Sequence, residues 1–166
     1  MSRKNPILWG SLTICIFVLA HGGLTAAPAG KKLKLKVNYT GAGVVDEKHK
    51  VWVLLFDANP FTASRLEDST SAPTPPVPAA GVSHILRRQA ASGNNATVTF
   101  TNLTLSPVYA AAFFDKGGSY DGHSDPVSGS PMGVYGKAVD QAEPITLGEG
   151  KPAEVVLTFN DSFKTP

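Results

Sequence analysis

The chain has 166 residues, with 15 lysines and arginines against 13 aspartates and glutamates. This length corresponds to about one domain with a proper core. Arg3 and Lys4 lie in an N-terminal segment that differs in composition from the rest, and the other 13 basic residues balance the 13 acidic ones. A near-neutral domain lacks the basic excess of proteins that bind nucleic acids or anionic membranes, so we expect neither partner.

Residues 1–29 have the features of a secretory signal peptide. The basic start is followed by an apolar run from Ile7 to Ala20 and by small residues at Ala27-Pro28-Ala29. This order is typical of a cleaved signal, and the run is shorter than the roughly 20 residues of a membrane-spanning helix. We expect cleavage after Ala29 and a periplasmic or secreted protein. The only cysteine, Cys15, would be removed, leaving a domain without disulfides.

Alternating polar and apolar residues predict strands along the mature chain. Lys32 to Tyr39 alternates strictly, and we interpret it as an outer strand whose lysines form the solvated face and discourage edge-to-edge pairing. Val51 to Phe56 and Val108 to Phe114 are apolar on both faces, as is typical of central strands. Trp52 is then expected in the core.

The remaining strands are shorter or weaker in pattern. They are expected at Val82 to Arg88, Thr97 to Thr101, Pro144 to Leu147 and Ala153 to Phe159, while Gly133 to Gly136 is a short segment punctuated by glycines. No segment has helical periodicity over three turns, and about seven strands separated by turn signals favour an all-β domain. The sequence therefore predicts a single seven-stranded β-sandwich over residues 30–166.

A proline-rich insertion interrupts this pattern at residues 57–81. Five prolines between Pro60 and Pro78 remove backbone donors and exclude a central strand there. A loop of this length in a small domain is often functional, so it is a second candidate surface.

Three short motifs resemble the core of prealbumin-like domains, among them the carboxypeptidase regulatory-like domains and related small secreted bacterial proteins. They are Val98-Thr99-Phe100-Thr101-Asn102-Leu103, Pro107-Val108-Tyr109 and Ala112-Phe113-Phe114-Asp115. The resemblance implies a seven-stranded sandwich with an Asp-bearing loop after its middle strands. Since such domains serve as accessory, adhesive and transport modules, it does not imply one activity.

The polar chemistry gathers in the loop from Asp115 to Met132. Oxygen-bearing side chains at Asp115, Ser119, Asp121 and Asp125 alternate with glycines, as a calcium site requires, although the spacing is not that of an EF-hand. The alternative is an ordinary loop whose aspartates cap turns. His123 together with Met132, His84 or His49 suggests a copper or zinc site, but no ligand spacing supports such a site.

Two further hypotheses concern ligand binding and catalysis. Tyr120, His123 and Tyr135 are candidates for ligand binding, because aromatic faces stack on sugars. Gly117 to Asp121 begins like a nucleophile elbow but lacks its final glycine and the following helix, so no catalytic residue is assigned. We expect a non-catalytic binding or accessory module without a required cofactor, with a protein or glycan partner. A calcium-stabilised or carbohydrate-binding domain using the same loop is the alternative.

Overall fold

The structure is a computed structural model and describes residues 30–61 and 83–165. The predicted signal peptide and residues 62–81 of the proline-rich insertion lie outside these residues. Within the described ranges, no helix is long and apolar enough to cross a membrane. The strands are β1 (Lys31–Tyr39), β2 (Val51–Phe56), β3 (Ile85–Ala90), β4 (Thr97–Leu103), β5 (Tyr109–Phe114), β6 (Met132–Val134), β7 (Gly136–Ala138), β8 (Gln141–Ala142) and β9 (Ala153–Phe159).

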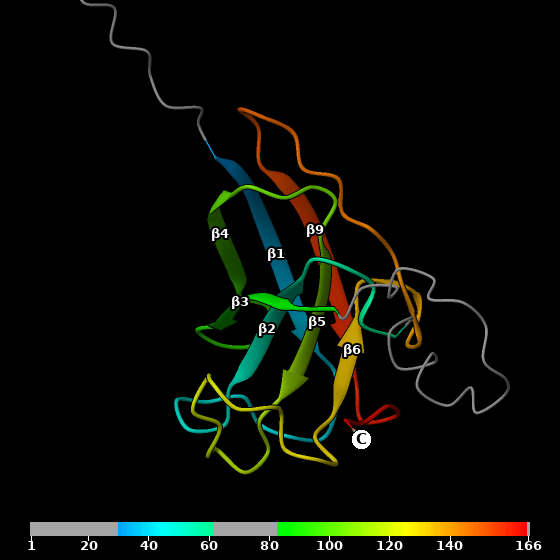
Figure 1. Cartoon of the computed structure of the whole chain (residues 1–166). Helices are drawn as coiled ribbons and strands as arrows, with labels where there is room; N and C mark the ends of the chain where they lie inside the picture. The colour runs from blue at the N-terminus through cyan, green and yellow to red at the C-terminus, as the bar shows by residue number, and fades with distance from the viewer. Residues whose placement is uncertain (1–29, 62–82, 166) are drawn as a thin grey trace, which may run out of the picture.

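Seven of these strands form two larger sheets that face each other (Figure 1). One sheet has the order β4-β1-β9, and the other has the order β3-β2-β5-β6. β7 and β8 pair separately as a small two-stranded sheet. The predicted all-β class is therefore confirmed, with a two-sheet sandwich as its architecture.

The main core lies between the two larger sheets. Alternate residues of β1 point inward, where Leu33 and Leu35 are fully buried, and they face the buried Val53 and Leu55 of β2. Burying each such side chain contributes about 1.5–3 kcal/mol before conformational entropy is subtracted. The alternation that predicted the strands is thus the alternation between this core and solvent.

β1 is the central strand of its sheet, which corrects the expectation of an outer strand. It pairs antiparallel with β4 and parallel with β9, from Leu33 opposite Ala153 to Tyr39 opposite Phe159. Alternation reports that one face is buried, but it does not reveal how many neighbours a strand has. The lysines of β1 therefore do not protect a sheet edge.

β2 and β5 have neighbours on both sides, as predicted from their apolar runs. β3 begins later than expected, and its register with β2 shifts between Leu55 and Phe56. A bulge of this kind disturbs the regular alternation of faces, which explains the weak pattern in this segment. The strand expected at Pro144 to Leu147 is reduced to one bridge, between Ile145 and Val108.

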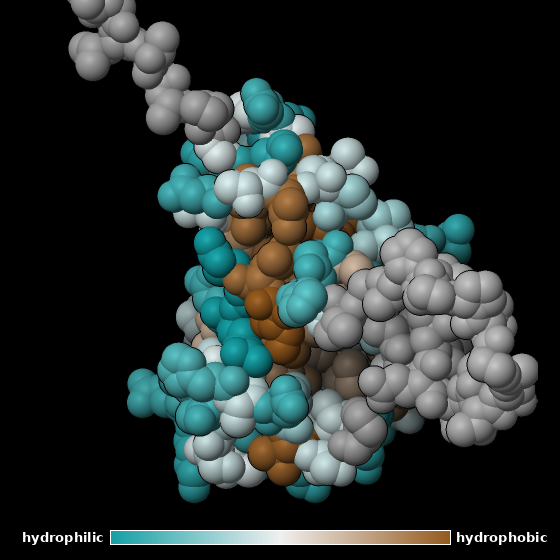
Figure 2. Space-filling view, viewed as in Figure 1, coloured by the Kyte–Doolittle hydropathy of each residue, from teal (hydrophilic) through white to brown (hydrophobic). Residues whose placement is uncertain are grey.

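The outer face of the β3-β2-β5-β6 sheet carries a second apolar layer. Figure 2 shows the side of the molecule on which β3 lies, where a stripe of hydrophobic side chains is bordered by hydrophilic ones and continues beyond this sheet. Buried Leu54 and Phe113 lie in this layer with Trp52, Phe56 and Met132 packed against them. Trp52 was expected in the core, but it lies on this outer face, because the even-numbered residues of β2 point away from the opposite sheet.

The end of β1 is tied to the C-terminal segment by Tyr39. Its ring stacks on Phe114 at a centroid distance of 4.6 Å, and its hydroxyl donates a hydrogen bond to Asp161. Burial and then the bond to Asp161 raise the pKa of Tyr39 to about 12. Chain segments distant in sequence are thereby joined at the end of the sandwich that also carries the loop after β5.

Adjacent residues of β1 provide a direct test of this architecture. We expect Leu35→Ala to lower the free energy of unfolding by about 2–5 kcal/mol, because Leu35 is fully buried. Lys36→Ala, on the opposite face, should change it by no more than about 0.5 kcal/mol. Urea denaturation followed by circular dichroism measures both, and equal losses would contradict the assigned faces.

Candidate functional site

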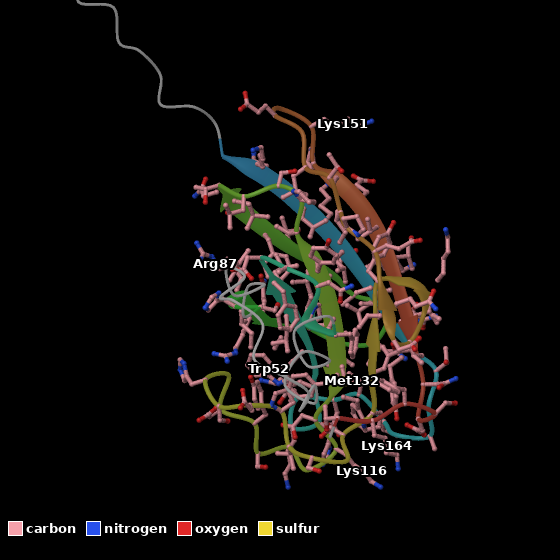
Figure 3. All side chains as sticks on the ribbon, turned by 45° about the vertical axis from the view of Figure 1, so that its right-hand side comes forward. Trp52, Arg87, Lys116, Met132, Lys151 and Lys164 are labelled. Atoms are coloured by element: carbon pink, nitrogen blue, oxygen red, sulfur yellow. The ribbon has the colours of Figure 1, made fainter. Side chains whose placement is uncertain are left out.

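The loop between β5 and β6 spans residues 115–131 and leaves the sheet at one end of the sandwich. Trp52, Met132, Lys116 and Lys164 lie toward this end, and Lys151 lies toward the other (Figure 3). The loop is fixed by contacts at its start, middle and end. We therefore describe it from its anchors to its exposed side chains.

Asp115 anchors the start of the loop. Its carboxylate is buried and accepts hydrogen bonds from the backbone N–H groups of Gly118 at 3.0 Å and Tyr120 at 2.8 Å. Its own N–H donates to the carbonyl of Lys50 at 2.9 Å. Asp115 thus caps a turn, which is what the alternative interpretation of this loop predicts for its aspartates.

Tyr120 anchors the middle of the loop on the outer face of the sheet. The ring is buried and packs edge-on against Trp52 and Phe113, at centroid distances of 5.0 and 4.8 Å. Each such pair contributes about 0.5–1.5 kcal/mol beyond the area it buries. The hydroxyl donates to the carbonyl of Ser124 at 2.9 Å, and burial raises the pKa of Tyr120.

Asp121 organises the next turn at the surface. One carboxylate oxygen accepts bonds from the N–H groups of His123 and Ser124 and from the Ser124 hydroxyl, at 2.8 to 2.9 Å. The N–H of Ser124, followed by that of His123, lowers the pKa of Asp121 to about 2. Gly122 follows with φ of 80°, and a Cβ there would lie 3.0 Å from the Trp52 ring. The left-handed backbone and the close approach both favour glycine at this position.

The C-terminal segment holds the end of the loop. The Thr165 hydroxyl accepts a bond from the N–H of Ser130 at 3.0 Å and donates to the carbonyl of Val127 at 2.6 Å. The N–H of Gly129 donates to the carbonyl of Thr165 at 3.0 Å. The end of the loop is thus held by Thr165, a residue far along the chain in the C-terminal segment.

The predicted site residues divide into buried anchors and exposed groups. Asp115 and Tyr120 are buried, and Tyr135 follows β6 at the opposite end of that strand from the loop. The exposed residues are Ser119, Asp121, His123 and Asp125. In the part of the chain that the structure describes, no three His, Cys, Asp or Glu side chains are grouped to hold a metal ion. The calcium site stays a prediction.

The sequence analysis did not predict the residues of the sheet on which the loop packs. Trp52 Nε1 and Arg88 Nε are the buried side-chain polar atoms without a hydrogen-bond partner among the described residues. Arg88 lies opposite Leu54 on the same outer face, and its charge acts on Tyr120 in the direction opposite to burial. An arginine within a strand segment was the available signal, but the bulge in β3 obscured which face it occupies.

Comparison of the chain with protein-family models, with curated proteins and with solved structures found no match. The site is therefore interpreted from its own chemistry.

Removing the first anchor should loosen the loop. We expect Asp115→Ala to lower the free energy of unfolding by about 1–3 kcal/mol, because amide N–H groups lose their acceptor. Amide exchange at Gly118 and Tyr120, measured by NMR, should accelerate more than exchange in β1. Asp125→Ala is the matched control, since its side chain is exposed and should change stability by about 0.5 kcal/mol at most.

The Asp121 turn has a defined pH dependence. Because its folded pKa of about 2 lies below the ordinary 3.8, this group stabilises the fold above that ordinary value and loses its contribution as the pH falls toward 2. The ¹³C shift of the Asp121 carboxyl should titrate with a midpoint near 2. Ser124→Ala should leave the midpoint below 3.8, because the two N–H bonds persist. A wild-type midpoint near 3.8 would exclude these bonds in solution.

Proposed function

We propose that this chain is an exported, non-catalytic binding or accessory module that engages a protein or glycan partner through the loop at residues 115–131. The exported state rests on the order of basic, apolar and small residues in positions 1–29. The described residues form a two-sheet sandwich, and the loop presents Ser119, Asp121, His123 and Asp125 at its surface.

One observation carries the proposal: the loop is ordered by its own hydrogen bonds and aromatic contacts. Asp115 and Tyr120 are used as buried anchors, and His123 and Asp125 are left exposed on the backbone that these anchors hold. A backbone held in this way loses little conformational entropy when a partner binds. Exposed polar groups on a fixed loop are therefore suited to recognition.

We also propose a relationship to prealbumin-like domains, which rests on three short motifs. The Phe100 to Leu103 unit closes β4, Pro107 precedes the start of β5, and Asp115 follows its end. The kinship is compatible with an accessory role, because such folds present loops at the ends of their sheets.

The exposed end of the loop can be tested by site-specific crosslinking in cells of the source organism. The only cysteine is Cys15, within the proposed signal peptide, so an Asp125→Cys variant of the exported chain would carry a single thiol. A photoreactive label on this thiol should yield a discrete crosslinked product. Mass spectrometry of the recovered chain should show an N-terminus at Gly30.

Lys151→Cys is the matched control, since it is exposed, lies toward the opposite end of the molecule (Figure 3) and should give no such product. Equal crosslinking from both positions, or from neither, would contradict the loop as the working surface. Melting with EDTA and with millimolar calcium separates the alternative function. Under the proposal the melting temperature is the same in both, whereas a calcium-dependent rise that Asp121→Ala abolishes would indicate a calcium-stabilised domain.

A further inference from the structure

A row of lysines runs along the middle of the outer face of the β4-β1-β9 sheet. Lys32, Lys34 and Lys36 occupy alternate positions of β1, and all three are exposed. Alternate residues of a strand lie about 7 Å apart. Since β1 has a partner strand on each side, edge protection does not account for these lysines.

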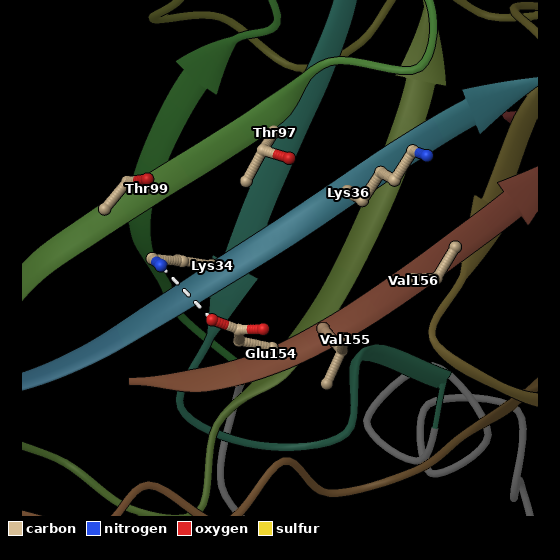
Figure 4. A pocket seen from close by; sticks show the side chains of 7 residues that line it. All are labelled: Lys34, Lys36, Thr97, Thr99, Glu154, Val155 and Val156. Atoms are coloured by element: carbon tan, nitrogen blue, oxygen red, sulfur yellow. Dashed lines mark hydrogen bonds and ion pairs between the residues drawn. The ribbon is translucent and has the colours of Figure 1, made fainter. Parts of the chain in front are cut away.

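Hydroxyl groups flank this row on one side. Thr99 of β4 lies opposite Lys34 and Thr97 lies opposite Lys36, while Glu154 and Val156 of β9 occupy the other side (Figure 4). The outward residues of the three strands are Lys32, Lys34, Lys36, Asn38, Thr97, Thr99, Thr101, Glu154, Val156 and Thr158. A shallow hollow of about 510 Å³ lies over the middle of this face.

The face has an excess of positive charge, although the proposed mature chain is near neutral. Glu154 is the one acidic residue among these outward side chains, and it pairs with Lys34 at 3.2 Å. No ion pair within residues 30–61 and 83–165 includes Lys32 or Lys36. An exposed pair such as Lys34 with Glu154 is weak, so all three lysines are available to an anionic ligand.

We propose that this face binds an extended anionic polysaccharide. Its carboxylate or sulfate groups would lie along the lysines of β1, and its hydroxyl groups would bond to the threonines of β4. Val156, which is 59% exposed beside Lys36, offers an apolar contact to the C–H face of a sugar ring.

The chemistry of the face favours this ligand over other polyanions. The outward residues include no aromatic side chain, whereas single-stranded nucleic acids are held largely by stacking on aromatic rings. An acidic peptide typically adds to an open strand edge, but the backbone of β1 is paired with both neighbours. Ionic and hydroxyl contacts across a sheet face suit a charged glycan.

This inference does not rest on the proposed role of the loop. Tyr120 and Trp52 lie on the outer face of the other sheet, so the two surfaces can be altered separately. Loss of binding at one surface should leave the other intact.

Titration calorimetry on the purified full-length protein tests the inference with polygalacturonate, dextran sulfate and neutral dextran. We expect binding to one or both polyanions, no binding to neutral dextran, and weaker binding at about 0.3 M salt. The stronger polyanion identifies carboxylate or sulfate as the preferred group. A Lys32→Ala/Lys36→Ala variant should bind roughly tenfold more weakly, and Glu154→Gln should bind severalfold more tightly.

The matched control is Lys48→Ala/Lys164→Ala, which removes the same charge from exposed positions outside β4, β1 and β9. It should bind like the wild type, and all variants should keep the wild-type melting temperature. An equal loss in the control would show that binding follows net charge and would overturn the inference. Absence of binding to both polyanions would overturn it as well, as would tighter binding of a thymidine oligonucleotide through the same lysines.

Discussion

The parallel pairing of β1 with β9 is the constraint on which the rest of the structure depends. It joins the first and last strands of the sandwich along the whole length from Leu33 to Tyr39. Parallel neighbours cannot be connected by a tight turn, so the remaining strands must form between them in the chain. The pairing gives β1 a neighbour on each side, completes the inner face against which β2 and β5 pack, and brings Asp161 to Tyr39.

The two outer faces of the sandwich have different chemistry because the two sheets are covered differently. The β3-β2-β5-β6 sheet has apolar residues on its outer face, and the loop at residues 115–131 buries part of them under Tyr120. The β4-β1-β9 sheet has lysines and threonines on its outer face, so that face stays in water. The numbers of basic and acidic residues are nearly equal, yet the two outer faces differ in charge. Polar and charged residues are distributed by face rather than by segment.

Local hydrogen bonds shape the turns of the loop, and contacts with residues distant in sequence fix its position. Asp115 and Asp121 close turns with amides that lie within five residues, and such bonds can form wherever the backbone bends. The position of the loop over the sheet depends instead on Tyr120 meeting Trp52 and on Thr165 meeting Ser130. These contacts cross the fold, and they determine which polar side chains remain exposed.

The sequence by itself determined the all-β class, the positions of β1, β2, β5 and β9, and the loop in which polar side chains gather. These features follow from the period of the side chains and from turn residues, which act over a few neighbouring positions. Only the tertiary structure decided that β1 is central, that Trp52 faces outward, and that Asp115 and Tyr120 are buried anchors. Strand order and burial depend on pairings between residues far apart in the chain, and alternation in a single strand is the same for a central and an edge position.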